Sequence, residues 1–274
     1  VGFYVWNFGM LIMSAAGICA LTLMLGVGNG GKQLFFDYLR HPLIFFLNFL
    51  PIFLFELLVY CLVNRAWIAF LVSSLVFVTA GVGNYFKLMF RDDPFMFSDI
   101  SAIHTALGVS SNYNITLTKR IVICLVCVVI GTLLLFFFVR GRAGGITRAV
   151  MALTMALSIW PLWKFVFSST DIYRWKAENY THVNRWAANE VYCSKGFVYP
   201  FIYSIQATMD LPPENYDEAE AEASLAAYSN SDIPGDKRVN ILAIQLEAFC
   251  DLTELGLDGF ADVYADYHEL EKES

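Results

Sequence analysis

The sequence predicts a mostly α-helical membrane protein: a five-helix transmembrane bundle, interfacial linker helices, and then the first strand of an α/β domain. Hydrophobic residues make up 57% of the 274 residues and charged residues only 16%, which excludes a disordered chain and is unusual for a soluble globular protein. The charge is also divided, because residues 1–169 carry 11 Lys/Arg against 5 Asp/Glu whereas residues 170–274 carry 7 against 20. We therefore expect a transmembrane domain over 1–169, an interfacial and acidic linker over 170–236, and the incomplete start of a second domain over 237–274.

Five apolar stretches justify the transmembrane domain. At a rise of about 1.5 Å per residue, each is long enough to cross a hydrocarbon core of roughly 30 Å, and each is almost free of charge. Only a helix satisfies every backbone polar group within one segment in lipid, so each stretch is interpreted as a helix. The stretches cover approximately residues 9–27, 43–63, 66–85, 121–139 and 149–167.

The short connections predict the orientation. Arg65 lies in the second connection and Arg140, Arg142 and Arg148 lie in the fourth, with no acidic residue among them. The first and third connections carry more Lys/Arg in total, but these are spread over far more residues. The density of positive charge in the short loops places the second and fourth connections in the cytoplasm. We therefore expect a multi-pass protein of the cell membrane with a cytoplasmic N-terminus and an extracellular C-terminal region.

Glu56 is an ionisable residue half-way along the second apolar stretch. A carboxyl group at that depth is costly and is by default a functional candidate. Arg65 and Lys164 are expected nearer opposite membrane faces, so the sequence supplies no partner at the depth of Glu56. Two interpretations remain open: a structural hydrogen bond between helices, or a polar cavity or substrate path.

The third connection, residues 87–120, is long and contains the sequence FRDDPFMFSD at residues 90–99. Aromatic residues and Met beside mixed charge suit the headgroup layer, where rings anchor and charges face water. The segment is interpreted either as an interfacial anchor or as a surface that handles lipid headgroups.

Two other local motifs are interpreted as structural. Residues 26–32 (GVGNGGK) fit the first seven positions of a phosphate-binding loop, but Gln33 stands where Ser or Thr is required and the motif follows a membrane helix instead of a strand. We expect a flexible loop there. Cys124 and Cys127 form a CxxC motif within a membrane stretch and lack further soft ligands nearby, so a structural role is favoured over redox or metal chemistry.

Aromatic residues alternate with polar ones after the last membrane stretch, from residue 171 to 209, in a spacing that suits short amphipathic helices lying on the bilayer. Residues 215–227 (NYDEAEAEASLAA) predict a short acidic helix, because its carboxylates come early where the helix dipole favours them. Residues 229–236 contain Asn, Ser, Pro and Gly and predict a linker. Acidic residues spaced through 262–273 predict a solvated helix face.

Residues 238–247 (RVNILAIQLE) form a near-continuous apolar run, which is the pattern of a strand buried on both faces in a parallel sheet. Such sheets place ligand chemistry beyond the carboxyl ends of their strands, and Glu247 is at that end. Its carboxylate suits a divalent metal ion, or alternatively an N-cap or edge salt bridge for the following helix.

Four stretches resemble the lipoteichoic acid synthase family, the sulfatase-fold, membrane-anchored phosphoglycerol transferases of Gram-positive bacteria. Residues 240–249 (NILAIQLEAF) are similar to the opening strand of the extracellular catalytic domain of that family. The other three are the loop 90–99, Gly196-Phe197 to Pro200 after the last helix, and residues 267–271 (YHELE). The order of these stretches and the five helices before an outside enzyme match the arrangement of the family.

The resemblance implies a transferase that moves glycerol phosphate from phosphatidylglycerol to a growing polyglycerolphosphate chain in lipoteichoic acid and cell-wall biosynthesis. It implies a metal, manganese or magnesium, with Glu247 as one ligand, a nucleophilic Thr, and a later Asp/His pair. The Thr, Asp and His would lie beyond Ser274, and Thr253 is not at the family position. We therefore expect this 274-residue chain to be inactive alone, since one carboxylate is far short of about six ligands.

The alternatives are a related sulfatase-fold phosphoethanolamine transferase or hydrolase, and a non-catalytic membrane anchor or transport component. The expected partners are membrane lipids and the polyglycerolphosphate acceptor, and no nucleic acid. The sequence leaves the oligomeric state and the substrate-binding residues open.

Overall fold

The structure is a computed structural model. It describes residues 2–28, 31–102, 116–177, 184, 186–209, 216–226 and 263–273. These residues are mostly helical, and no strand occurs among them. The chain divides into two compact units, Val1–Leu211 and Pro212–Ser274, which are described separately.

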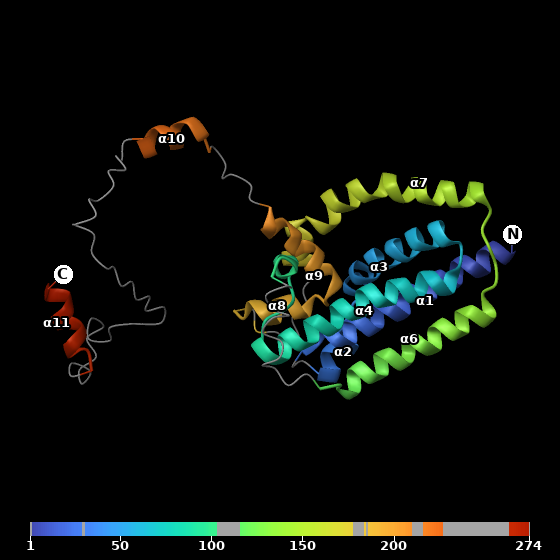
Figure 1. The fold of residues 1–274 in the computed structure, drawn as a ribbon, viewed down its shortest axis with the longest axis horizontal. Coiled ribbons are helices and arrows are strands. Elements are labelled where there is room, and N and C mark those ends of the chain that lie inside the picture. Colours follow the sequence, from blue (N-terminus) through green and yellow to red (C-terminus); the bar gives the residue numbers. More distant parts are fainter. Residues whose placement is uncertain are drawn as a thin grey trace, which may run out of the picture. The chain divides into compact units, whose positions relative to one another are not determined.

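Five helices of the first unit are long and apolar enough to cross a membrane, which confirms the predicted membrane-spanning helices. They run in alternating directions along the bundle, so that the short connections meet at one end and the long connections at the other (Figure 1). The helix α4 continues beyond the predicted end at residue 85. The elements are α1 (Gly2–Gly26), α3 (Pro42–Val63), α4 (Ala66–Arg91), α6 (Lys119–Phe138) and α7 (Gly145–Leu162), which continues as the π-helix η4 (Trp163–Phe167).

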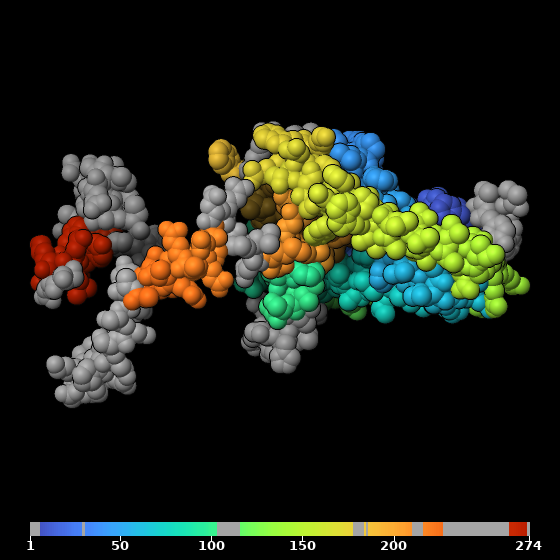
Figure 2. All heavy atoms as spheres, turned by 90° about the horizontal axis from the view of Figure 1, so that it is seen from above, coloured from blue at the N-terminus to red at the C-terminus, as the bar shows by residue number. Residues whose placement is uncertain are grey.

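The helix α4 is the centre of the bundle and packs against α1, α3 and α6. Its contact with α6 depends on Gly131, because an added Cβ there would lie 2.7 Å from Cζ of Phe70 on α4. A side chain at this position would therefore require the ring of Phe70 to move out of the contact. The helix α7 lies along the outside of the bundle (yellow-green in Figure 2), and Met155 is its one buried residue. The apolar side chains that α7 exposes suit contact with lipid.

At the end of the bundle with short connections, polar side chains join the end of α3 to the connection between α6 and α7. Asn64 ends α3 in the left-handed conformation, with φ +57°, and its N–H donates to the carbonyl of Tyr60 at 2.7 Å. Its side chain exchanges two hydrogen bonds with the backbone of Ala143, at 3.0 and 2.8 Å. Arg148 donates to the carbonyl of Cys61 at 3.0 Å. The connection between α6 and α7 is thereby fixed to the end of α3.

Short helices gather at the other end of the bundle (Figure 1). One of them, α2 (Gly31–Arg40), was not predicted, because it lies in a glycine-rich connection and is too short and too polar for a membrane span. The short helices predicted between 171 and 209 are present, but several of their aromatic residues are buried in the bundle instead of lying on its surface: Phe197 is 2% and Tyr199 0% exposed. The other short elements are η2 (Phe97–Ile100), η5 (Ile172–Lys176), α8 (Ala188–Ser194), α9 (Val198–Tyr203) and η7 (Ser204–Thr208).

The second unit contains two described helices. The helix α10 (Glu218–Ala226) confirms the acidic helix predicted at 215–227, and its carboxylates are exposed. The helix α11 (Ala265–Glu273) confirms the helical segment predicted at 262–273. The predicted linker 229–236 and the predicted strand 238–247 lie outside the described residues, so the α/β domain stays a prediction.

Candidate functional site

A buried asparagine in the second spanning helix holds one of the stretches that carry the family resemblance. Asn48 on α3 is 0% exposed. Its Nδ2 donates to the carbonyl of Lys195 at 2.8 Å, and its Oδ1 accepts hydrogen bonds from the backbone N–H groups of Phe197 and Tyr199, each at 3.1 Å. One side-chain amide therefore satisfies three backbone groups of a turn that leads into α9.

The same turn requires glycine and is held from a second side by α2. Gly196 has φ +92°, and an added Cβ would lie 2.5 Å from Nδ2 of Asn48, so both the backbone conformation and the close approach exclude a side chain. The hydroxyl of Tyr38 on α2 donates to the carbonyl of Cys193. Burial raises the pKa of Tyr38 well above its usual range, so its phenol stays neutral and remains a donor. Side chains of α2 and α3 thus fix one backbone turn.

Cys193 lies in this turn region as a neutral thiol. Burial, followed by the negative charges of Asp92 and Glu190, raises its pKa to about 12. Thiolate is the reactive form of cysteine, so this environment disfavours reaction of Cys193. Of the CxxC motif, Cys124 is 0% exposed between helices, whereas Cys127 is exposed.

The loop 90–99 is folded around the ammonium group of Lys87 at the end of α4. The Nζ of Lys87 lies 2.6 Å from a carboxylate oxygen of Asp93 and 2.8 Å from one of Asp99, and it donates to the carbonyl of Pro94 at 2.9 Å. Asn84, one turn earlier, accepts a hydrogen bond from the N–H of Phe95 at 2.9 Å. The acidic residues of this loop that face Lys87 are therefore neutralised within the protein.

The loop 90–99 and the segment that follows Gly196 pack on each other, although about a hundred residues separate them. The hydroxyl of Tyr192 donates to the carbonyl of Phe95 at 2.9 Å. The N–H of Phe97 donates to Oγ of Ser204 at 2.9 Å. The rings of Phe95 and Phe201 are stacked with centroids 5.7 Å apart. We call this joined unit, residues 87–100 and 189–204, the membrane-end platform.

The platform is the candidate functional site. It brings together two of the four stretches on which the family resemblance depends, and it lies at the end of the bundle from which the chain leads to the second unit (Figure 1). Its apolar residues Phe90, Met96 and Phe97 keep partial exposure, which suits contact with the lipid interface. Sequence reasoning identified the aromatic loop but missed Asn48 and Tyr38, whose one local signal was a polar group within or beside an apolar run.

Glu56 makes a hydrogen bond between two helices. Its side chain is 0% exposed, and Oγ of Ser14 on α1 lies 2.5 Å from its Oε1. Its Oε2 has no hydrogen-bond partner among the described residues. Of the two open interpretations, the structure supplies the contact that the structural one requires. Ser14 was missed because hydroxyl side chains are ordinary in membrane helices and draw no attention in a sequence.

Glu247, the predicted metal ligand, lies outside the described residues, as does Thr253. Among the residues that the structure does describe, no three His, Cys, Asp or Glu side chains are grouped so that they could hold a metal ion. The ligand set that the resemblance implies is therefore represented by one carboxylate known from the sequence alone.

Comparisons of the chain with protein-family models, curated proteins and solved structures gave no match.

Proposed function

We propose that this chain contains the membrane domain, and the beginning of the catalytic domain, of a phosphoglycerol transferase that moves glycerol phosphate from phosphatidylglycerol to a polyglycerolphosphate chain. The observation that carries the proposal is the packing of the loop 90–99 on the segment 189–204. Two stretches that resemble one enzyme family at distant sequence positions form a single unit at one end of five apolar helices. This packing gives both stretches a common place in the fold.

The platform suits a lipid-consuming reaction because of its place in the membrane. The phosphodiester of a phospholipid lies at headgroup depth, and the platform is at the end of the spanning helices, where that layer is expected. In this proposal Lys87, Asn84 and Asn48 hold the platform rigid, and the aromatic residues of the loop 90–99 contact the lipid surface. The complete catalytic domain would then take a lipid substrate from the extracellular face of the membrane.

The chemistry assigned to the complete catalytic domain, of which residues 237–274 are the beginning, is transfer through a covalent phosphothreonine. The threonine oxygen forms a bond to phosphorus as diacylglycerol leaves, and the terminal hydroxyl of the acceptor chain then displaces the threonine. A divalent manganese or magnesium ion would lower the pKa of the threonine hydroxyl and stabilise charge on the phosphoryl group. Glu247 is the ligand that the resemblance assigns to this chain.

The proposal is tested with the natural gene product, including any sequence that follows Ser274, in liposomes that contain phosphatidylglycerol labelled in its head glycerol. We expect labelled polyglycerolphosphate and an equal amount of diacylglycerol. Glu247→Gln should abolish both products, whereas Glu220→Gln, at an exposed position of α10, should leave them unchanged. Equal activity of the wild type and Glu247→Gln would overturn the assignment.

Two further assays separate the alternatives. Label from phosphatidylethanolamine, and none from phosphatidylglycerol, would favour the related phosphoethanolamine transferase. A natural reading frame that stops after Ser274 would favour a non-catalytic anchor or transport component. The purified 274-residue chain should form no product, and phosphoglycerol transfer by this chain alone would contradict the expected role of a threonine beyond it.

A further inference from the structure

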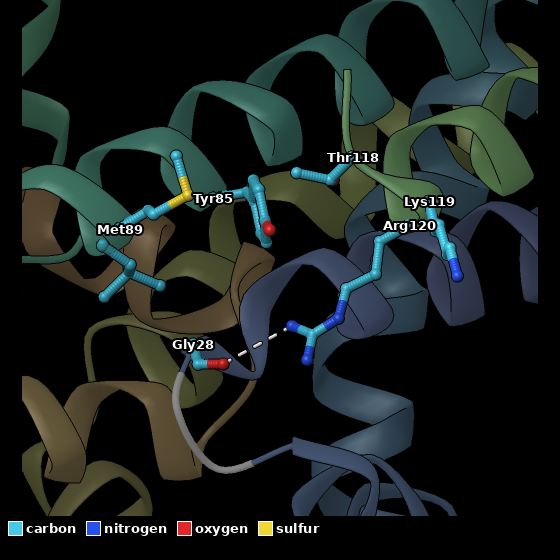
Figure 3. A pocket seen from close by; sticks show the side chains of 7 residues that line it. Gly28, Tyr85, Met89, Thr118, Lys119 and Arg120 are labelled. Atoms are coloured by element: carbon cyan, nitrogen blue, oxygen red, sulfur yellow. Dashed lines mark hydrogen bonds between the residues drawn. The ribbon is translucent and has the colours of Figure 1, made fainter. Parts of the chain in front are cut away.

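A hollow lies between three helix ends at the same end of the bundle as the platform. Its volume is about 340 Å³, which is at the lower limit of ordinary ligand sites and suits a headgroup better than a whole lipid. Figure 3 shows Arg120 extending from the start of α6 toward the carbonyl of Gly28, just past the end of α1, with Tyr85 of α4 beside it. The lining residues are Gly28, Tyr85, Leu88, Met89, Thr118, Lys119 and Arg120.

The hollow carries positive charge that the described residues leave uncompensated. A nitrogen of Arg120 donates to the carbonyl of Gly28 at 3.4 Å, a long contact, and the guanidinium lies 5.9 Å from the ring centroid of Tyr85. Neither Arg120 nor Lys119 forms an ion pair within the described ranges. The sequence from 100 to 118 contains no Asp or Glu, so that part of the connection offers no counter-ion either. This end of α6 is therefore suited to an anion from outside the chain.

A second set of donors in the hollow has no partner among the residues that the structure describes. Thr118 is the N-cap residue of α6, yet its side chain makes no capping hydrogen bond. Its Oγ1 is buried and has no hydrogen-bond partner among the described residues. The first backbone N–H groups of a helix also lack partners within the helix, and they favour negative charge. The hollow thus combines two cationic side chains with a hydroxyl donor and open backbone donors.

The position of the hollow indicates which kind of anion it would bind. Lys119 and Arg120 begin one membrane-spanning helix, and Tyr85 and Met89 lie near the end of another, so these residues are expected at headgroup depth. Tyr85, Leu88 and Met89 form an apolar wall. Such a wall suits the glycerol backbone and first methylene groups of a lipid and gives nothing to a free phosphate ion.

We propose that this hollow binds the phosphate of an anionic phospholipid. Arg120 and Lys119 contact the phosphate oxygens, the hydroxyl of Thr118 donates to one of them, and the α4 wall packs against the lipid backbone. The glycine-rich connection 26–32 then contributes through Gly28, whose carbonyl orients Arg120. The inference does not depend on the transferase proposal, because it concerns binding without turnover.

The test is lipid binding to the purified 274-residue chain in a neutral detergent, measured by native mass spectrometry with phosphatidylglycerol and phosphatidylcholine as probes. We expect phosphatidylglycerol to bind at least tenfold more tightly, as a charge-assisted site requires. The double variant Arg120→Gln/Lys119→Gln should weaken phosphatidylglycerol binding by about tenfold or more and leave phosphatidylcholine binding unchanged. The matched control Arg140→Gln/Arg142→Gln removes the same charge from the other end of the bundle and should change neither.

Two further arms make the test decisive. Thr118→Val keeps the charge and shape and should still lower phosphatidylglycerol affinity by about tenfold, so general electrostatics cannot mimic the result. Soluble glycerol phosphate should not displace the lipid. Displacement at equal concentration would contradict the proposal, because it would show that the hollow binds a soluble phosphate compound equally well. Equal losses in the two double variants, or an unchanged affinity in Thr118→Val with helix content preserved, would overturn the proposal.

Discussion

At each end of the helix bundle, the side chain of an asparagine makes hydrogen bonds to the backbone of a distant segment. The two ends differ in the size of the segment that the asparagine holds. At the short-loop end, Asn64 makes two hydrogen bonds to Ala143 and joins one connection to one helix end. At the platform end, Asn48 makes three hydrogen bonds to the turn at 195–199 and is fully buried. Asn64 therefore joins one connection to the bundle, whereas Asn48 positions the membrane-end platform on it.

The two ends also differ in how their charged residues are paired. In the connections at the short-loop end, Arg65, Arg140 and Arg142 lie among no acidic residues. At the platform end, Lys87 joins Asp93 and Asp99 into one cluster, while Arg120 and Lys119 form no ion pair with the residues that the structure describes. A bare basic loop suits the cytoplasmic membrane surface, and an internally neutralised loop suits a site with a defined structure.

The largest expected effect is the all-or-none exposure of the two ends to protease. In right-side-out vesicles, we expect a glutamate-specific protease added outside to cleave at the exposed Glu218 and Glu220 of α10. Trypsin should reach Arg140 and Arg142 only from the cytoplasmic side. Fragment masses on gels or by mass spectrometry give the answer. Cleavage of the region 217–236 from the cytoplasmic side would reverse the orientation proposed for the molecule.

The next largest effect separates the two asparagines. Asn48→Leu leaves three buried backbone groups unpaired, at about 1–3 kcal/mol each, so it should lower the free energy of unfolding by about 3 kcal/mol or more. Asn64→Leu frees two groups in a partly exposed turn, where water replaces the lost bonds, and should lower it by about 1 kcal/mol. Denaturant unfolding in detergent measures both. Equal losses would show that Asn48 does no more than Asn64.

Hydrogen exchange locates the consequence of each substitution. In Asn48→Leu, the amides of Phe197 and Tyr199 should exchange much faster, because they lose their acceptor. In Asn64→Leu, faster exchange should be confined to the amide of Ala143. Protection that falls evenly over the whole molecule in both variants would contradict a local role for either residue.

The contrast between the ends also explains what the sequence could predict. Uncharged runs of about twenty residues have one stable solution in a bilayer, so the five spanning helices followed directly from composition. The contact of Asn48 with Phe197 joins positions 149 residues apart, and no local pattern encodes it. The hydrogen bond between Glu56 and Ser14 was missed for the same reason, although the cost of burying Glu56 marked one of its two members. The helix α2 was missed because ten amphipathic residues after a glycine-rich turn look like a loop.

A smaller effect is expected when the positive charge that neutralises the loop 90–99 is removed. Lys87→Gln removes the cation from Asp93 and Asp99, which are 48% and 25% exposed in their side chains. Since the pairs are partly solvated, we expect a loss of about 1 kcal/mol in the free energy of unfolding, with faster hydrogen exchange at Phe95 and Met96. The difference from wild type should shrink in high salt.

The matched control for this loop is Lys164→Gln. Lys164 is exposed and lies over the ring of Trp160, 5.2 Å from its centroid, so its loss should not alter exchange in the loop 90–99. Faster exchange at Phe95 in both variants would mean that general positive charge, and not the cluster around Lys87, orders the loop.

The smallest expected effect concerns the buried pair between the two ends. A double-mutant cycle with Ser14→Ala and Glu56→Gln should give a coupling energy of about 0.6 kcal/mol, the usual size of a hydrogen bond between membrane helices. A structural pair of this strength joins α1 to α3 and leaves both ends independent, so neither variant should change lipid binding at Arg120 or exchange in the platform. If Glu56→Gln instead abolished phosphoglycerol transfer while helix content and stability were kept, Glu56 would lie on a substrate path that links the two ends.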